Sequence, residues 1–368
     1  MNITVLQENL LQHIQNAVRF IATKPQIPIL TGIVFRAENG KLTLQATDMR
    51  MGLEVSFPVK IEEEGEVVAP AKILAEFLHT LSPGAVTIKT DGDTIHIIQK
   101  TMKGKLPSYS IQEFPPFPLA SNTWIELPTS VFLETAQGAL YAASLDETRP
   151  ILASLLLELD KAAMTCVCTD GYRLSVVKTT LEKEIHAPLR ILLPARSMQE
   201  VLAVIGHSNT KTVRFSVSQE LSQSFFMIGE YTILVRLVEG EFPPYEKIIP
   251  TSFSFETIIS RQEWIAALKT AMVFAREGSS VITMEFSSDG CRISSSNSSM
   301  GENEGTIASS GKPSAPAKIA FNGKFLLDVL NHLESDDVLF KMNDELKPGL
   351  LLPEGKESPL SVIMPFKR

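Results

Sequence analysis

The stretch Arg149–Val177, RPILASLLLELDKAAMTCVCTDGYRLSVV, decides the fold, because an earlier part of the chain repeats its pattern. Pro150 and Thr169 each lie 122 residues after a matching residue, Pro28 and Thr47. In both copies the proline opens a Pro-Ile-Leu motif and the threonine opens a Thr-Asp pair, with no insertion between them. The two copies are therefore expected to share one local fold.

Each copy is predicted to form a β-hairpin that ends at the Thr-Asp pair. An apolar run at 32–36 or 154–158 leads into a short polar turn, which falls at 159–161 in the second copy. The next run alternates apolar residues with others, and this predicts strands with one buried and one exposed face. A third alternating run follows the Thr-Asp pair, so a further strand is expected there.

A helical stripe shows that the chain contains three copies rather than two. Three segments carry apolar residues at i, i+3, i+4 and i+7, the spacing of one helix face. These residues are Leu74, Phe77, Leu78 and Leu81; Met198, Val201, Leu202 and Ile205; and Leu326, Val329, Leu330 and Leu333. A second amphipathic helix opens each copy, near 10–21, 132–143 and 264–275. The expected fold class is α+β, with three repeated domains of two helices packed on antiparallel sheet.

Proline-rich segments mark the ends of the copies. Phe114-Pro115-Pro116-Phe117 recurs as Phe242-Pro243-Pro244-Tyr245, and the third copy ends with Met364-Pro365-Phe366. Such prolines suit extended connectors between domains. A chain of 368 residues is long enough for three cores of ordinary size. We therefore expect domains at 1–123, 124–251 and 252–368.

The third copy is the most divergent. Strands are expected at 281–286 and 291–295, but Asn297 stands where the other copies have aspartate. The stretch from Ser294 to Pro316 is rich in Ser, Gly and Pro. A mobile surface segment is expected there.

Composition and charge describe a folded, acidic protein. Hydrophobic residues make up 44% of the chain and the net charge is −8. An acidic total disfavours a protein that grips nucleic acid across a broad basic face. No signal peptide opens the chain and no apolar stretch is long enough to span a bilayer, so a cytoplasmic protein is expected.

The three cysteines, an odd number, do not form a disulfide framework. Cys166 and Cys168 lie two apart on an expected strand, so they face the same way and could serve a metal ion. Leu44 and Ala46 occupy the matching positions of the first copy, which favours a structural role. No metal and no cofactor are expected.

The sequence contains no phosphate-binding loop, dinucleotide fingerprint, zinc-protease motif or nucleophile elbow. Asp48 and Asp170 could be read as a carboxylate pair for acid–base chemistry. Duplication would place them in separate domains, however, and an aspartate after a strand commonly caps its own turn. A protein without catalytic residues is expected, and a hydrolase stays only a formal possibility.

The ordered set of motifs resembles the bacterial sliding clamp family, the β subunits of DNA polymerase III. The matching segments cover the whole chain and are PILTGIVF with ATDMRMGLEV, CTDGYRLSVV, LVEGEFPPYEKIIP and the ending SVIMPFKR. The resemblance implies a head-to-tail homodimer, a ring of six similar domains whose helices surround duplex DNA. Such a ring would tether DNA polymerase III, clamp loader subunits and other clients, and its contacts to phosphate would carry no sequence information.

The resemblance also implies a pocket between the second and third domains that receives a short linear peptide from these partners. Its residues here would be Leu152, Thr169, Gly171, Tyr172, Arg173, Leu174, Pro243, Lys247, Ile248, Val362, Ile363, Met364, Pro365 and Phe366. Apolar side chains from the hairpin, the connector and the C-terminal strand would converge there, with Arg173 and Lys247 at the rim. Family members often carry His in place of Tyr172 and Arg in place of Lys247.

The basic residues expected to contact DNA are Lys24, Lys72, Arg149 and Arg196. An alternative function is a three-domain peptide-binding scaffold of the same fold that does not encircle DNA. The mass of the particle in solution separates the two, because a ring requires a stable dimer.

Overall fold

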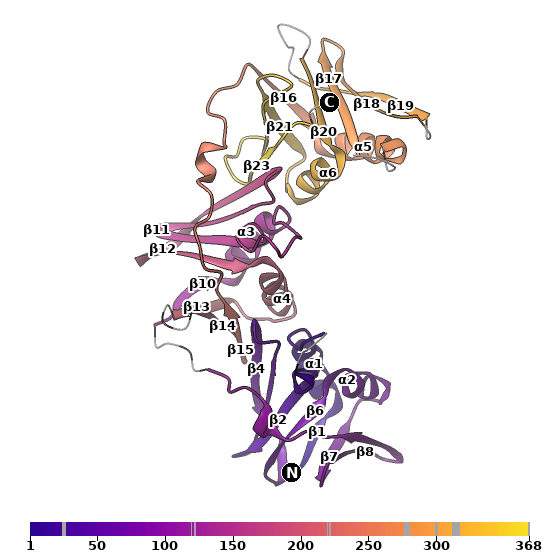
Figure 1. Cartoon of the computed structure of the whole chain (residues 1–368), viewed down its shortest axis with the longest axis vertical. Helices are drawn as coiled ribbons and strands as arrows, with labels where there is room; N and C mark the ends of the chain where they lie inside the picture. The colour runs from indigo at the N-terminus through magenta and orange to yellow at the C-terminus, as the bar shows by residue number, and fades with distance from the viewer. Residues whose placement is uncertain are drawn as a thin grey trace. The chain divides into compact units, whose positions relative to one another are not determined.

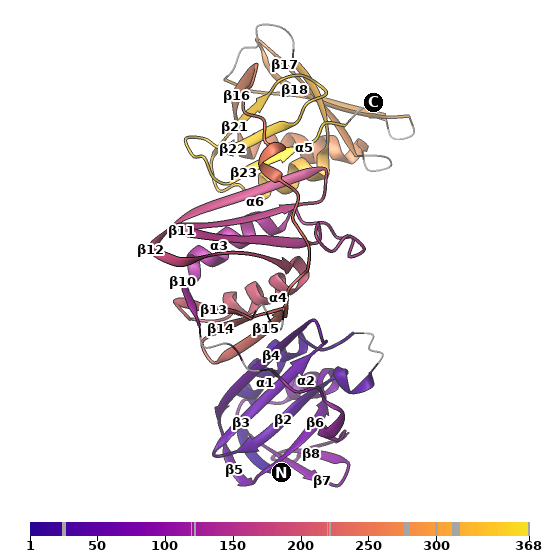
Figure 2. The same cartoon turned by 60° about the vertical axis from the view of Figure 1, so that its left-hand side comes forward.

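The computed structural model describes residues 1–23, 27–118, 120, 123–218, 220, 222–275, 280–298, 301–310 and 317–366, without the side chains at 186 and 187. Contacts within the chain define two compact units. The first comprises Met1–Ser130 with Arg196–Leu237, and the second comprises Val131–Ala195 with Val238–Arg368. The middle repeat therefore contributes to both units (Figures 1 and 2). The three domain boundaries remain predictions.

The first unit contains two antiparallel sheets. One has the order β5-β1-β7-β8-β9, with strands at Lys60–Glu63, Asn2–Leu6, Ala85–Asp91, Thr94–Gln99 and Met102–Pro107. The other has the order β10-β13-β14-β15-β4-β3-β2-β6, with strands at Ile125–Pro128, Thr212–Ser218, Gln223–Ile228, Tyr231–Arg236, Met51–Pro58, Lys41–Thr47, Gly32–Glu38 and Gly65–Pro70. Pairing of β15 with β4 joins the middle repeat to the first.

The helices of this unit bury the apolar stripes that the sequence predicts. They are α1 (Gln7–Val18), α2 (Ala71–Thr80) and α4 (Ala195–Gly206). Leu74 and Leu78 of α2 are buried, and so is the whole stripe of α4. Burial of one face explains why these short segments are helical. Two 3₁₀ turns complete the unit, η1 (Pro28–Thr31) and η2 (Ile111–Glu113).

The second unit repeats this plan. One sheet has the order β11-β12-β23-β22-β21-β16, with strands at Ser154–Thr169, Arg173–Pro194, Leu360–Ile363, Gly349–Pro353, Asp337–Met342 and Phe255–Ser260. The other has the order β19-β18-β17-β20, with strands at Gly301–Ile307, Gly290–Asn297, Val281–Ser287 and Ala317–Asn322. The helices are α3 (Thr129–Leu140), α5 (Arg261–Ala275) and α6 (Gly323–His332), and η3 spans Tyr245–Lys247. Pairing of β12 with β23 joins the middle repeat to the third.

The two joints between repeats use one register. Met51 of β4 pairs with Val235 of β15, and Arg173 of β12 pairs with Ile363 of β23. Arg173 lies 122 residues after Met51 and Ile363 lies 128 after Val235, which are the spacings of the sequence repeat. The predicted repeat is thus confirmed in the strand pairing itself.

The turn predicted at 159–161 falls within the long strand β11. Lys161 there has φ of 50°, and Asn39, which lies 122 residues earlier in the first hairpin, has φ of 51°. The chain therefore bends alike at both places, although in the second copy the strand runs through the bend.

Some strands were not predicted, and one prediction is wrong. Several short strands, among them β1, β9, β10 and β16, went unrecognised, although β1 and β16 do alternate more and less buried residues. The expectation of a mobile segment from Ser294 to Pro316 fails at Gly301–Ile307, which forms the ordered edge strand β19 against β18. Residues 299–300 and 311–316 lie outside the described part of the chain.

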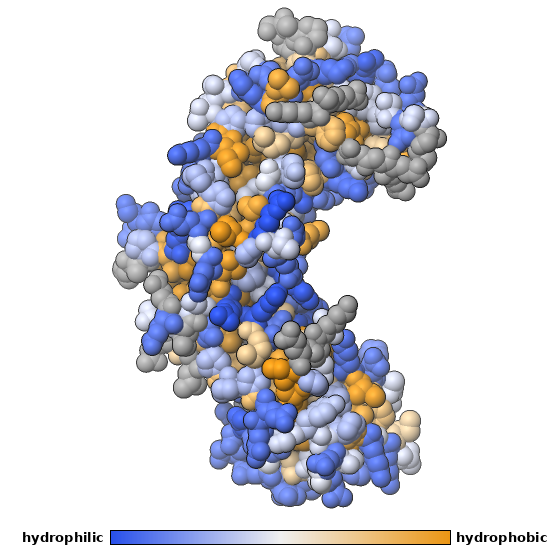
Figure 3. All heavy atoms as spheres, viewed as in Figure 1, coloured by the Kyte–Doolittle hydropathy of each residue, from blue (hydrophilic) through white to orange (hydrophobic). Residues whose placement is uncertain are grey.

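On the face drawn in Figure 3, hydrophobic residues form separate patches among hydrophilic ones. Within the described residues, no helix combines the length and apolar character needed to cross a membrane.

Candidate partner-binding site

The Thr-Asp turn of the second repeat is held by its own side chains. The Asp170 carboxylate accepts hydrogen bonds from the backbone N–H groups of Tyr172 and Arg173, both at 2.9 Å. The Thr169 hydroxyl donates to the carbonyl of Arg173 at 2.6 Å. Gly171 has φ of 91°, a left-handed conformation that favours glycine. Asp170 therefore caps its own turn, as predicted.

The first repeat builds the same turn. The Asp48 carboxylate accepts from the N–H groups of Arg50 at 2.9 Å and Met51 at 2.8 Å. The Thr47 hydroxyl donates to the Met51 carbonyl at 2.8 Å. Met49 stands in the place of Gly171 and also has a positive φ, 74°. The structural reading of the two aspartates is confirmed, because both are committed to equivalent turns.

Strand pairing brings the C-terminal segment to the second turn. Leu174 of β12 pairs with Val362 of β23, and the N–H of Met364 donates to the carbonyl of Tyr172 at 2.8 Å. Leu174 and Val362 belong to one buried group of side chains, which we call the apolar cluster. Its members are Leu156, Val167, Leu174, Leu192, Phe242, Tyr245, Leu350 and Val362. The hairpin, the connector and the C-terminal strand thus meet where the sequence analysis expected them to converge.

Several predicted peptide-binding residues expose large apolar side chains. The exposed fractions are 61% for Tyr172, 40% for Ile248, 38% for Met364 and 36% for Phe366. Exposed apolar groups of this size are the kind that a bound apolar peptide covers. Lys247 is exposed as well, as a residue at a rim should be.

Other predicted peptide-binding residues are buried beneath the exposed ones or are half-buried next to them. Ile363 and Pro365 are buried, whereas Leu152 and Pro243 are half-buried and lie outside the apolar cluster. Pro243 directly follows Phe242, a member of the cluster.

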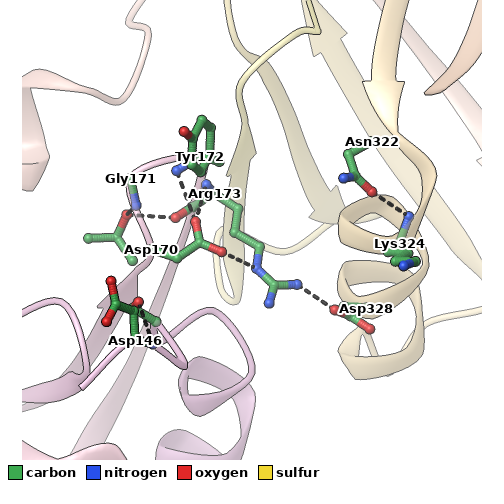
Figure 4. A network of polar contacts seen from close by, with 10 residues as sticks. Asp146, Asp170, Gly171, Tyr172, Arg173, Asn322, Lys324 and Asp328 are labelled. Atoms are coloured by element: carbon green, nitrogen blue, oxygen red, sulfur yellow. Dashed lines mark hydrogen bonds and ion pairs between the residues drawn. The ribbon is translucent and has the colours of Figure 1, made fainter. Parts of the chain in front are cut away.

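Arg173 does not stand at the rim as expected. Its side chain is only 9% exposed and forms ion pairs with Asp170, at 3.0 Å, and with Asp328 of α6. Figure 4 shows the guanidinium reaching from the turn across to the helix. It also lies over the ring of Phe325, 4.6 Å from the centroid. Arg173 thus fastens the turn to the third repeat, and its charge is used inside the protein.

Sequence reasoning missed the partners of Arg173. Phe325 and Asp328 lie on α6 next to residues of the predicted apolar stripe. Tyr141 contributes a further ring, which stacks on His332 at 4.4 Å and whose hydroxyl shares a hydrogen bond of 2.8 Å with Ser361. The contacts join residues more than 150 positions apart, so no local sequence signal could have identified them.

Three of the four predicted DNA-contacting residues lie in the described structure, and their contact with DNA stays a prediction. Lys72 on α2 and Arg196 on α4 are exposed in the first unit. Arg149 belongs to the second unit and forms an ion pair with Asp146 at 3.6 Å. Lys24 lies outside the described residues.

Burial shifts the pKa values of several side chains that pack inside the protein. Burial raises the pKa of the Cys166 and Cys168 thiols and raises that of Cys291 to about 12, so all three stay protonated. Burial lowers the pKa of His13 to about 4. Within the described residues, no three His, Cys, Asp or Glu side chains gather closely enough to hold a metal ion.

Comparison with known proteins accounts for nearly the whole chain. Residues 1–118 match the family model of the DNA polymerase III β subunit N-terminal domain, 126–244 match its central domain, and 246–367 match its C-terminal domain. The chain belongs to the DNA polymerase III β-subunit family, the bacterial sliding clamps. The α+β fold of repeated units expected from the sequence is that of this family.

Individual relatives of this clamp family agree. A β sliding clamp of Synechococcus elongatus is 26% identical over 95% of this chain and 94% of its own. The crystal structure of the Thermotoga maritima β subunit is 26% identical, covers 100% of this chain and 99% of its own, and superposes with a TM-score of 0.93. The sliding clamp of Bacillus subtilis, 23% identical with the same coverage and a TM-score of 0.94, shows the same fold.

Proposed function

We propose that this family member is a DNA sliding clamp that works as a ring-shaped homodimer and performs no catalysis. Two copies would close head to tail around duplex DNA and tether a polymerase to its template. The observation that supports this most strongly is the match to all three β-subunit domains in order along the chain. The ring, its DNA and its partners are the parts that require testing.

Two sheet edges that have no partner strand among the described residues offer a joint between copies. β9 is the edge of the five-stranded sheet in the first unit, and β19 is the edge of the four-stranded sheet in the second. An unpaired edge offers free backbone N–H and C=O groups to a strand of another chain. A joint between β9 of one copy and β19 of the other uses two different surfaces, and two such joints close a ring.

The two edges carry opposite charge. Lys103 and Lys105 alternate with glycine on β9, and both are exposed. Glu302 and Glu304 alternate with asparagine on β19, and both are exposed. Because alternate residues of a strand face the same way, each edge presents two like charges in a row. Opposite charges on facing strands favour this pairing and disfavour β9 with β9 or β19 with β19.

An exposed aliphatic side chain lies on the helix behind each edge. The ring of Phe77 on α2 packs so closely on β9 that a Cβ added to Gly104 would lie 2.8 Å from it. Ile73 on the same helix is exposed. On the other edge, α5 packs on β19 and exposes Val273. These side chains would supply apolar contact beside the strand pairing.

Partners are proposed to bind at the Tyr172 turn, the connector and the C-terminal segment. A client peptide that packs on the apolar cluster would cover the exposed side chains of Tyr172, Ile248 and Met364. Such a peptide groove fixes a client by a few apolar anchors. The DNA contacts proposed for Lys72, Arg149, Arg196 and Lys24 would go to phosphates, so they would weaken with salt.

The solution mass tests the ring against the alternative of a monomeric peptide-binding scaffold. Light scattering at micromolar concentration is expected to give about 81 kDa, twice the 40.5 kDa of one chain. A mass near 40 kDa at all concentrations up to about 0.1 mM, well above a micromolar dissociation constant, would favour the scaffold.

A further inference from the structure

A cavity continues the face of the sheet that carries the apolar cluster. Leu174, Val176 and Lys178 alternate along β12, so their side chains share one face. Beside them is a cavity of about 480 Å³, whose lining includes Thr165, Val176, Lys178 and Tyr245. Val176 packs on the apolar cluster and Tyr245 belongs to it. The cavity is therefore continuous with the candidate partner site.

The joint between the first two repeats provides an internal comparison, because it has the same strand pairing. Gln45 and Glu54 stand there in the places of Val167 and Val176, 122 residues earlier. The Gln45 side chain donates to the Glu54 carboxylate at 2.5 Å. The second joint therefore has two apolar side chains, Val167 and Val176, where the first has two polar side chains that hydrogen-bond to each other.

The next positions along the strand differ in the same sense. Thr43 and Ser56 stand in the places of Thr165 and Lys178, and their hydroxyls share a hydrogen bond of 2.5 Å. Lys178, by contrast, forms no side-chain ion pair with any described residue. The second joint thus has a lysine without an ion-pair partner among the described residues, where the first joint has two hydroxyls that bind each other.

A connector side chain also covers the first joint. Gly52 occupies the place of Leu174, and a Cβ added to it would lie 3.0 Å from the ring of Phe117. The ring therefore occupies space that the Leu174 side chain fills at the second joint. Shared turns and strand pairing do not make a partner site by themselves, since the first joint has both and is closed.

The remaining charges of the cavity are largely balanced. The Tyr245 hydroxyl donates to the Glu158 carboxylate at 2.9 Å, and Arg190 pairs with the same carboxylate at 3.3 Å. Burial, with the neighbouring Glu158, raises the pKa of Tyr245, so its hydroxyl remains a donor. Asp160 also lines the cavity and is exposed. Lys178 is the lining charge nearest along the strand to the apolar floor at Val176.

We propose that the partner site extends from the apolar cluster over Val176 into this cavity, where it binds the residues that flank the apolar motif of a client peptide, and that Lys178 favours an acidic flank. This inference rests on the proposed function of the site. It assigns the choice between client peptides to the cavity rather than to the turn and the C-terminal segment.

The test compares a core peptide with extended versions. The core is the tightest binder from a library of fluorescein-labelled pentapeptides built from Leu, Phe, Ser and Gln, measured by fluorescence anisotropy. Extension by Asp-Glu at one end is expected to tighten binding roughly 2- to 5-fold, the worth of an exposed ion pair, and extension by Lys-Lys is expected not to. Lys178→Glu should reverse this preference, and raised salt should erase it.

Matched variants separate the cavity from general charge effects. Lys161→Glu makes the same charge change in the same hairpin at a residue that does not line the cavity, so it should leave the preference intact. Val176→Glu imports the residue of the first joint and should weaken the core peptide at least about 10-fold, because a carboxylate would replace part of an apolar floor. Its melting temperature shows whether the variant is folded, and Val176→Thr is the milder substitute.

The outcomes are distinct for the two proposals. If no library peptide binds, or if deletion of residues 364–368 leaves binding unchanged, the proposed partner site itself is wrong. If the core peptide binds at that site but neither extension matters, or if Lys161→Glu acts like Lys178→Glu, the cavity has no role in selection and this inference is overturned.

Discussion

Arg173 joins two repeats through a single side chain. Its guanidinium is almost fully buried between Asp170 and Asp328, so the cost of removing a charge from water is offset by two carboxylates and an aromatic face. Loss of one partner of such a pair usually destabilises more than loss of both. Because Asp170 also caps the turn beside Tyr172, the same network holds the candidate partner site in shape.

His13 plays a comparable part between the first two repeats. Its Nδ1 lies 2.8 Å from the Tyr231 hydroxyl, which also accepts a hydrogen bond of 3.0 Å from Asn16. The tyrosine proton is thus directed at Nδ1, so the network suits a neutral ring with its proton on Nε2. Glu230 is the facing carboxylate, 3.7 Å from Nε2.

The lowered pKa of His13 predicts that the protein loses stability in acid. Burial lowers the pKa of His13 from 6.5 to about 4, so the unfolded state binds a proton first. The stabilisation is fully present above pH 6.5 and is lost as pH falls toward 4, by at most about 3 kcal/mol in the free energy of unfolding. Urea denaturation at pH 7.0, 5.5 and 4.5 measures it.

His13→Gln is the matched variant, because it keeps a polar side chain but cannot be protonated. It should be less stable than the parent at pH 7 and should lose less stability on acidification. Equal losses in the two proteins would contradict the assignment.

At the scale of elements, the sequence predicted what periodicity and duplication reveal. The helical stripes of α4 and α6 are buried as expected, as is the α2 stripe except for the half-buried Phe77, and the Thr-Asp turns form at both predicted places. The edge strands were harder, because β9 and β19 are short, rich in charge and exposed. Edge strands have such sequences because they must avoid unwanted pairing, and this removes the alternation by which a strand is recognised.

Charge reversal at these edges tests the joint between copies. Lys103→Glu with Lys105→Glu should place like charges against Glu302 and Glu304 and raise the dimer dissociation constant by at least about 10-fold. Combining it with Glu302→Lys and Glu304→Lys should restore the dimer. Analytical ultracentrifugation over a dilution series gives the constants.

The control changes two exposed lysines elsewhere in the first unit, Lys41→Glu and Lys60→Glu. If this control dissociates the dimer equally, net charge is responsible. If the four-residue variant stays monomeric while folded, these strands do not face one another.

At the scale of the whole molecule, the repeat and the family were accessible from the sequence and the site was so only in part. The turn, the connector and the C-terminal strand could be assembled because each is marked by a local motif. The inward course of Arg173 could not, since it depends on Asp328 of α6. The cavity beside Val176 could not either, since Tyr245 of η3 meets β11 and β12 there only in the folded chain. Local patterns do not encode such long-range contacts.

The negative net charge of the whole molecule agrees with the proposal of a ring that encircles DNA. A protein with a net charge of −8 gains little from non-specific attraction to DNA. Encirclement would keep it on the template without strong attraction, and weak contacts to phosphate would let it move along the duplex.

Retention on circular DNA tests the central claim most directly. The protein is loaded onto a nicked circular plasmid with a clamp loader, separated by gel filtration at moderate salt, and compared before and after the plasmid is cut once by a restriction enzyme. We expect it to stay with the circle and to leave once the DNA is linear, because a ring slides off a free end. Equal retention on the circular and the linear form, or no retention on either, would contradict a ring that encircles DNA.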